Sequence, residues 1–386
     1  MPQTLISPLP ARRATPRRRR RRRVVALVLA VALVYPMTTY VQVLVYPGQA
    51  SFTARTVDWL RQMGLDAPVN AIENWWYTRK QPGTGAPAAT ALPPTRTPTV
   101  AAPGARPSDL VVHSGLAGEG VWVPGARAAD GTAALYTTFV RPDPRHGSVV
   151  AGVAWLNQDL TAATLVPGTR EPGGSVGPDH AVPLGMRSSL LATFNSGFKM
   201  RDANGGCYLN GTTIGTLRDG AAAVVLTRDG RVGIGQWGRD HTLGPDVIAV
   251  RQNLDLVIDR GQPVPGLDQN TAEHWGNARN QFQYTWRSGL GLDSHGNLLY
   301  VGGDQLTLHT LADAMRQAGV VRGMELDIHT GMVVFTAYRP DSPGTSPTRL
   351  LPGMSSPPDR YLVPDQRDFF AIALRAPRTH ASTLSP

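Results

Sequence analysis

Residues 323–330 read Gly-Met-Glu-Leu-Asp-Ile-His-Thr, an alternation of apolar and ionisable side chains with a period of two. Successive side chains of a β-strand point to opposite faces. The pattern therefore predicts a strand that buries its apolar residues on one face and presents Glu325, Asp327 and His329 in a row on the other. Alternate residues of a strand lie about 7 Å apart, so this row indicates acid–base chemistry.

The sequence around this strand predicts a fold of the α+β class. Short apolar runs alternate with Gly and Pro turns from residue 109 onward. An Asp-Gly pair at residues 229–230 and a Ser-His-Gly turn at residues 294–296 each separate two such runs, which predicts two hairpins.

One helix is predicted directly before the opening strand. Apolar residues recur at helical spacing over residues 307–318, and Gly319 follows them. Residues 369–374 are typical of a last buried strand. We therefore expect a β-rich mixed sheet with hairpins and a helix–strand unit.

The N-terminal part of the chain predicts a membrane anchor. Residues 1–23 contain nine arginines and no acidic residue, and residues 24–45 contain no charge. Twenty-two such residues are long enough to span the roughly 30 Å of bilayer hydrocarbon. Arginines beside the span predict a single pass with the N-terminus in the cytoplasm and the main domain extracytoplasmic.

A cleaved signal peptide is the alternative for this segment. Gly-Gln-Ala at residues 48–50 offers a small-x-small cleavage site. The apolar stretch is longer than the usual signal-peptide core of about 7–15 residues, which favours an uncleaved signal-anchor. In either case residues 46–386 are expected outside the cytoplasmic membrane.

Three further segments are predicted beyond the span. Residues 46–80 carry two short helical patterns, whose Trp, Tyr and basic residues suit either a membrane–water interface or a helical hairpin docked on the main domain. Residues 81–108 are dominated by Pro, Ala, Thr and Gly and predict a semi-rigid linker. Residues 109–386 form the predicted globular domain.

Charge and cysteine content exclude some functions. Removing the nine N-terminal arginines from the formal charge of +10 leaves +1, so the expected partners do not include nucleic acid. Cys207 is the one cysteine, which leaves no intramolecular disulfide and indicates a structural thiol. No cofactor is expected, because no cysteine or histidine metal cluster is present in the sequence; a divalent metal with oxygen ligands stays open.

Three segments together resemble the phosphodiester glycosidase family. Residues 195–198, Asn-Ser-Gly-Phe, resemble the family's N-G-G-F-F type turn. Residues 287–291 resemble its R-[ST]-A-[IVL]-G strand, and Leu326-Asp327 occupies the first two positions of its L-D-G-G-G-S type segment after a helix. The resemblance covers residues 150–375, and the layout with an N-terminal span and a Pro-rich linker is similar to that of membrane-anchored bacterial members. It implies the family's fold and hydrolysis of a sugar–phosphate linkage.

One departure from the family pattern follows the aspartate. Residues 328–330, Ile-His-Thr, stand where the family has glycines. A glycine turn lets backbone N–H groups approach an anion closely. His329 is a candidate cation that would replace this function.

The chemistry of such a reaction assigns roles to the candidate residues. Asp327 is the candidate nucleophile or base, and Glu325 the candidate acid if its pKa is raised. Asn195 would hydrogen-bond a sugar hydroxyl or orient a water. The candidate substrate-binding residues are Arg287, Gly197, Lys199 and His329, with Arg287 suited to bidentate phosphate contact.

Structural roles are the alternative for the same residues. Arg287 would pair with Asp327 inside the fold. Glu325 and His329 would belong to a solvated strand face, and Asn195 would form a turn.

The sequence thus favours a membrane-anchored extracytoplasmic hydrolase acting on a glycan or phosphoglycan of the cell envelope. The membrane contact is expected through residues 24–45. Two alternatives stay open: a non-catalytic module that binds carbohydrate or phosphopolymer, motivated by the missing glycines, and a hydrolase of neutral glycans that uses Glu325 and Asp327.

Overall fold

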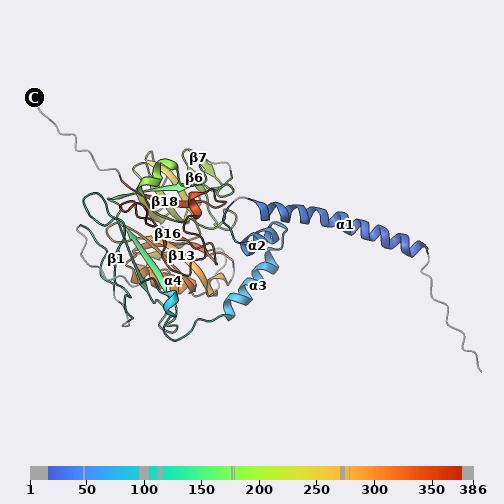
Figure 1. The fold of residues 1–386 in the computed structure, drawn as a ribbon, viewed down its shortest axis with the longest axis horizontal. Helices are drawn as coiled ribbons and strands as arrows, with labels where there is room; N and C mark the ends of the chain where they lie inside the picture. Colours follow the sequence, from blue (N-terminus) through green and yellow to red (C-terminus); the bar gives the residue numbers. More distant parts are fainter. Residues whose placement is uncertain are drawn as a thin grey trace, which may run out of the picture. The chain divides into compact units, whose positions relative to one another are not determined.

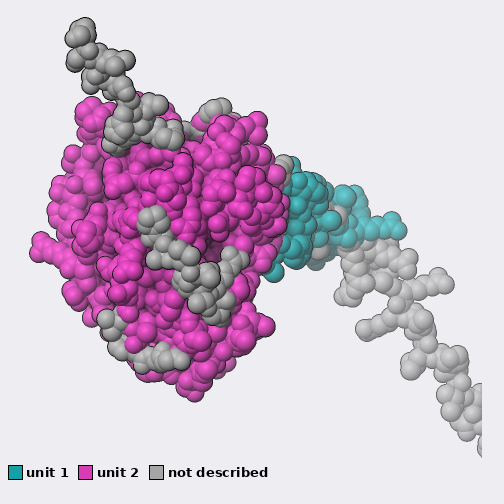
Figure 2. Space-filling model, turned by 60° about the vertical axis from the view of Figure 1, so that its left-hand side comes forward, with its two compact units in different colours: residues 1–46, 52–69 teal, residues 47–51, 70–386 magenta. Residues whose placement is uncertain are grey.

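The computed structural model describes residues 16–46, 48–94, 104–110, 112, 116–174, 177, 179–269, 274–277 and 279–375 (Figure 1). The chain divides into two compact units, coloured separately in Figure 2. The first comprises Met1–Tyr46 and Phe52–Val69, and the second Pro47–Ser51 and Asn70–Pro386.

Helices make up the described part of the first unit. They are α1 (Pro16–Val45), α2 (Phe52–Gln62) and the first turn of α3 (Asp66–Arg79). Arg55 of α2 donates to the carbonyl oxygens of Val43 and Leu44, at 2.8 and 3.2 Å. These carbonyls end α1 without helical partners, so the guanidinium caps the helix where a cation is favoured.

Helix α1 contains one segment, Arg23–Val45, that is long and apolar enough to cross a membrane. This conclusion rests on length and composition in the described residues. A signal sequence near an N-terminus has the same properties, so both interpretations of the segment remain predictions.

Three antiparallel sheets build the described part of the second unit. The first sheet runs in the order β1 (Val123–Pro124), β2 (Leu135–Val140), β3 (Ala151–Leu156), β14 (Leu298–Leu306), β13 (Thr285–Leu292), β15 (Arg322–Ile328), β11 (Leu256–Asp259), β12 (Gln262–Pro263). The second runs β7 (Thr212–Ile214), β6 (Cys207–Leu209), β10 (Val247–Gln252), β8 (Ala222–Thr227), β9 (Val232–Gln236). The third runs β17 (Thr348–Arg349), β16 (Phe335–Ala337), β5 (Leu190–Asn195), β18 (Phe369–Leu374), β4 (Thr161–Val166).

The α+β class expected from the sequence is confirmed. The predicted hairpins are β8–β9 and β13–β14, and the predicted last strand is β18. Within the described residues every strand ladder is antiparallel, so the sheet expected to be mixed is antiparallel. Short 3₁₀ helices connect the strands: η1 (Ala89–Ala91), η2 (Leu184–Ser189), η3 (Asn280–Phe282) and η4 (Arg360–Leu362).

Helix α4 (Leu308–Gln317) lies against the first sheet and precedes β15, as predicted. Thr307 caps its N-terminus in a reciprocal capping box with Thr310. The helix packs closely because the sheet presents glycines beneath it. A Cβ on Gly289 would lie 2.6 Å from the sulfur of Met315, and one on Gly323 2.5 Å from the Cε of the same methionine.

The predicted linker, residues 81–108, is described except for residues 95–103. This segment belongs to the second unit, and part of it packs against the globular part of that unit. The backbone N–H and hydroxyl of Ser148 donate to the carbonyl of Gly83, at 3.3 and 2.7 Å. Leu92 packs against the core between the sheets. The boundaries of the linker and of the other predicted segments stay predictions.

Candidate active site

A β-bulge in β15 changes the simple alternation expected from the sequence. Gly289 of β13 lies opposite Glu325, and Arg287 lies opposite Ile328. Opposed residues of an antiparallel pair project to the same side of the sheet, so Glu325 and Ile328 share a face although three positions separate them. Because the bulge adds one residue to β15, Ile328 does not lie on the same face as Met324 and Leu326. Asp327 for the same reason does not lie on the same face as Glu325.

The core contacts of β15 agree with this correction. Met324 and Leu326 belong to the core that contains Phe194 of β5. Ile328 instead packs in the core formed with α4, which contains Leu311. The two carboxylates of the strand consequently have different neighbours.

Glu325 forms a buried ion pair with Arg287. Arg287 Nη1 lies 2.6 Å from Oε1 of Glu325, and both side chains are at most 1% exposed. Arg287 Nε donates to the carbonyl of Leu306 at 2.9 Å, and Nη2 donates to the carbonyls of Asn280 and Gln283. Burial raises the pKa of Glu325, while the charge of Arg287 opposes that shift.

This position differs from what the sequence predicts for both residues. Arg287 pairs with Glu325, not with Asp327, and its donors are directed at protein acceptors. The guanidinium of Arg287 is therefore buried with its donors used by groups of the protein, and Glu325 does not lie on a solvated face. The pair therefore supports the sheet beneath the site.

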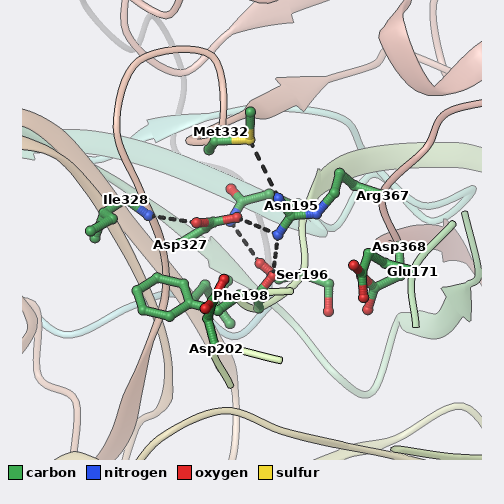
Figure 3. Close-up of polar contacts among 12 residues, drawn as sticks. Glu171, Asn195, Ser196, Phe198, Asp202, Asp327, Ile328, Met332, Arg367 and Asp368 are labelled. Carbon is green, nitrogen blue, oxygen red and sulfur yellow. Dashed lines mark hydrogen bonds and ion pairs between the residues drawn. The ribbon is translucent and has the colours of Figure 1, made fainter. Parts of the chain in front are cut away.

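Asp327 is the carboxylate that faces the turn after β5 (Figure 3). Its Oδ2 accepts a hydrogen bond from Nη2 of Arg367 at 2.8 Å, and its Oδ1 accepts one from the N–H of Ile328 at 2.8 Å. The same Nη2 donates to the carbonyl of Gly197 at 2.9 Å. Asp327 is 7% exposed, so this carboxylate sits almost entirely within the protein.

Burial raises the pKa of Asp327 to about 6 from an ordinary value of 3.8. The charges of Arg367 and Lys199 and the hydrogen bond from Ile328 oppose the shift, while the charge of Glu325 adds to it. The folded state thus holds this proton more tightly than the unfolded chain does. The contribution of Asp327 to stability is present below about pH 4 and is lost as the pH rises through 6.

Asn195 is buried, and its side chain makes four hydrogen bonds within the protein. Its Nδ2 donates to the carbonyl of Ser196 at 2.9 Å and to Oγ of Ser288 at 3.0 Å. Its Oδ1 accepts from the hydroxyl of Tyr300 and from the N–H of Val334, both at 3.0 Å. An amide side chain has two donor hydrogens and two acceptor lone pairs, so Asn195 has no capacity left for a sugar.

Asn195 acts on Asp327 through Ser288. The Ser288 hydroxyl donates to the carbonyl of Asp327 at 3.2 Å, and the N–H of Asp327 donates back to Ser288 Oγ at 3.3 Å. The hydrogen-bonding groups of Asn195 are thus all used within the protein, and they connect this side chain to Asp327 through Ser288.

The turn after β5, residues 195–199, is held against β15 by Asn253. Asn253 Nδ2 donates to the carbonyls of Glu325 and Leu326, at 2.8 and 2.9 Å. Its Oδ1 accepts from the N–H of Phe198 at 2.9 Å. Gly197 is needed here because a Cβ at this position would lie 2.9 Å from two atoms of the Asn253 side chain.

Replacing Gly197 with alanine is expected to lower the free energy of unfolding by about 1–3 kcal/mol, a typical cost of overpacking a core. The turn must shift, which displaces the carbonyl that holds Arg367. The matched control is Gly185→Ala, because a Cβ there meets no atom within 4 Å and the backbone does not have positive φ. Urea unfolding of both variants tests this, and equal midpoints would contradict it.

His329 points toward helix α3. Its ring stacks on Tyr77, with centroids 4.9 Å apart, and its Nδ1 lies 3.2 Å from the hydroxyl of Thr285. Its Nε2 lies 3.8 Å from Oε2 of Glu73. Its backbone has φ of +77°, in the left-handed region that favours glycine. The backbone at this position therefore has the conformation of a glycine turn although a histidine occupies it.

The structure brings together Asp327, Gly197 and Lys199 of the predicted residues and adds Arg367. Arg367 lies in a loop directly before β18, forty positions from Asp327. The available signal was a charged pair, Arg367-Asp368, immediately before an uncharged buried strand. Asp368 is also buried and pairs with Arg251 at 2.8 Å. Within the described residues no group of three or more His, Cys, Asp or Glu side chains could hold a metal ion.

Residues 189–352 match the model of the phosphodiester glycosidase family. The match extends from β5 to β17, and it contains both Asp327 and the turn at residues 195–199. The family match indicates a function of the glycosidase type. Arg367 lies outside the matched residues.

Solved structures add a partial likeness. The chain is similar to the zebrafish N-acetylglucosamine-1-phosphodiester alpha-N-acetylglucosaminidase catalytic domain auto-inhibited by its pro-peptide, with 15% identity, 66% of this chain and 88% of that chain covered, and a TM-score of 0.43. It is also similar to a hypothetical protein from Synechocystis, with 13% identity, 66% and 64% covered, and a TM-score of 0.37. No curated protein matches the chain.

Proposed function

We propose that the second unit hydrolyses a sugar-1-phosphodiester or a related envelope glycan, with Asp327 as its reactive carboxylate. The observation that carries this proposal is the setting of Asp327. A carboxylate that is 7% exposed is held against Arg367 at 2.8 Å, with the charge of Lys199 acting on it. Such a site combines a tuned carboxylate with cations, the two features that a sugar phosphate requires.

The proposed reaction breaks the bond between the anomeric carbon and a phosphate oxygen. Positive charge develops on the sugar in the transition state, and ionised Asp327 would stabilise it as a nucleophile or as a base toward water. The oxygen of water ends on the anomeric carbon, one proton of that water passes to Asp327 and then to solvent, and the phosphate leaves as a monoester with its bonding electrons. Arg367 and Lys199 would neutralise the phosphate.

This leaving group explains why a second carboxylic acid is not required. A phosphate monoester is stable as an anion, so it departs without the proton that an alcohol needs. Glu325 and Arg287 then serve as a buried support, and Asn195 positions Asp327 through Ser288. Gly197 and Lys199 keep their proposed place at the substrate, and His329 contributes the turn conformation through its φ of +77°.

The activity is expected to fall with acidity below pH 6. If ionised Asp327 is required, kcat/KM should decrease about tenfold for each pH unit below its pKa of about 6. A phosphodiester carries no proton in this range, so the substrate does not contribute to the profile. The pH dependence of kcat/KM between 4 and 8 tests this, and a flat profile would contradict the assigned protonation state.

The experiment that tests the function uses the full chain in detergent with a set of sugar-1-phosphodiesters. Release of free sugar and of a phosphate monoester, measured by mass spectrometry, is the expected result. Binding of phosphopolymer without any product would favour the non-catalytic module, which the replaced glycines at residues 328–330 motivate. Turnover of neutral glycosides alone would favour the hydrolase without phosphate recognition.

We also propose that the chain is a single-pass membrane protein. Residues 24–45 would form the span, with the N-terminus cytoplasmic and the glycosidase domain extracytoplasmic. The arginines before the span and the apolar segment Arg23–Val45 support this arrangement.

A further inference from the structure

We propose that the outward face of α3, formed by Ile72, Trp75, Trp76 and Arg79, docks on the surface of a bilayer with anionic head groups. These four residues, called the α3 stripe below, lie at positions i, i+3, i+4 and i+7. Residues at this spacing share one face of a helix. The stripe belongs to the second unit, which carries the glycosidase domain.

The opposite face of α3 is fixed to the glycosidase domain. The Tyr77 ring stacks on His329, and the Tyr77 carbonyl accepts from the N–H of Tyr284 at 3.2 Å. Asn74 accepts a hydrogen bond from Gln283. The sequence left open whether this helix is docked on the main domain or lies at a membrane–water interface. The face with Asn74 and Tyr77 is docked on the domain, and the α3 stripe is the face that we propose lies at the interface.

The α3 stripe is exposed although it is apolar and aromatic. The side chains of Ile72, Trp75 and Trp76 are 66%, 56% and 55% exposed. The Arg79 guanidinium lies 5.2 Å from the centre of the Trp75 ring, and exposed Lys80 follows. Large apolar side chains exposed side by side on one helix face are typical of a site that binds a protein or a membrane.

Its chemistry fits a membrane surface. Trp side chains favour the head-group region of a bilayer, and arginine and lysine are attracted to anionic lipids. The acidic residue of residues 70–80, Glu73, lies next to His329 and not on the stripe. Four side chains on one helix are too few for a second copy of the chain, because stable protein interfaces bury about 800 Å² on each partner.

The chain also keeps the stripe near a membrane if the proposed span is inserted. Twenty-six residues separate Val45 from Ile72, which limits the distance to about 90 Å at full extension. The helical turns of α2 shorten that reach further. Docking of the stripe would hold the domain that carries Asp327 in one orientation at the bilayer surface.

Spin labels on the full chain in nanodiscs of phosphatidylcholine and phosphatidylglycerol test this proposal. Ile72→Cys carries the label, and Cys207 can remain because it is buried and burial raises its pKa to about 12. Leu184→Cys, an exposed apolar position of η2, is the aqueous control. Val41→Cys in α1 reports insertion of the span.

For each label we compare the accessibility to oxygen with the accessibility to a water-soluble nickel chelate. The proposal expects the ratio of oxygen to chelate accessibility to be at least threefold higher at residue 72 than at residue 184. Replacing phosphatidylglycerol with phosphatidylcholine should reduce this difference. An aqueous label at residue 72 with a lipid-exposed label at residue 41 would overturn the docking. Low accessibility to both reagents that depends on protein concentration would show a protein partner instead and would also overturn it.

Discussion

Asp327→Asn is expected to lower sugar release from a sugar-1-phosphodiester by about 10³-fold, the range in which positioned acid–base groups act. Asparagine keeps the shape of the side chain and one oxygen to accept a hydrogen bond from Ile328 or Arg367. It removes the negative charge that would stabilise the sugar in the transition state. The loss should appear in kcat more than in KM, because the interaction is made in the transition state.

The matched control for this substitution is Asp246→Asn, at an exposed carboxylate directly before β10. The same chemical change there should leave the rate within twofold of the unchanged protein. Circular dichroism and the urea midpoint report whether each variant is folded. Full activity in folded Asp327→Asn would remove Asp327 from the mechanism.

Arg287→Met is expected to lower the free energy of unfolding by about 3–5 kcal/mol, the cost of leaving one partner of a buried ion pair alone. Glu325 is completely buried, and its Oε1 accepts a hydrogen bond from Nη1 of Arg287. Methionine fills part of the volume but donates no hydrogen bond to Glu325 or to the carbonyl of Leu306. The loss should shrink as the pH falls from 8 to 5, because Glu325 can then take up a proton.

Two further variants separate the charge effect from the loss of volume. Arg287→Met combined with Glu325→Leu should recover a large part of the stability, because it removes both buried charges. Arg339→Met breaks the more exposed pair with Asp341 and should cost less than about 1 kcal/mol. Urea unfolding of all three provides the comparison. An equal loss in Arg287→Met and Arg339→Met would contradict the buried-pair assignment.

Elements with a strong local pattern could be predicted from the sequence. The residues of β5 and β18 and the helix after Thr307 follow from apolar periodicity and from capping and glycine signals. The strand that contains Asp327 also followed from its alternation. These features depend on residues close together in the chain, so a single sequence contains them.

The partners of the charged residues could not be predicted in the same way. The bulge in β15 depends on its register with β13, and this register separates Glu325 from Asp327. Arg367 reaches Asp327 from the loop before β18, forty residues away. Such contacts arise from the packing of the first sheet against the third, which no local pattern records.

Hydrolysis in water enriched in ¹⁸O tests the central claim most directly. The full chain is incubated with a sugar-1-phosphodiester, and the masses of both products are measured by mass spectrometry. Cleavage at the anomeric carbon predicts that ¹⁸O enters the reducing sugar while the phosphate monoester keeps only ¹⁶O from the substrate. Incorporation of ¹⁸O into the phosphate would show attack at phosphorus and would contradict a glycosidase mechanism centred on Asp327.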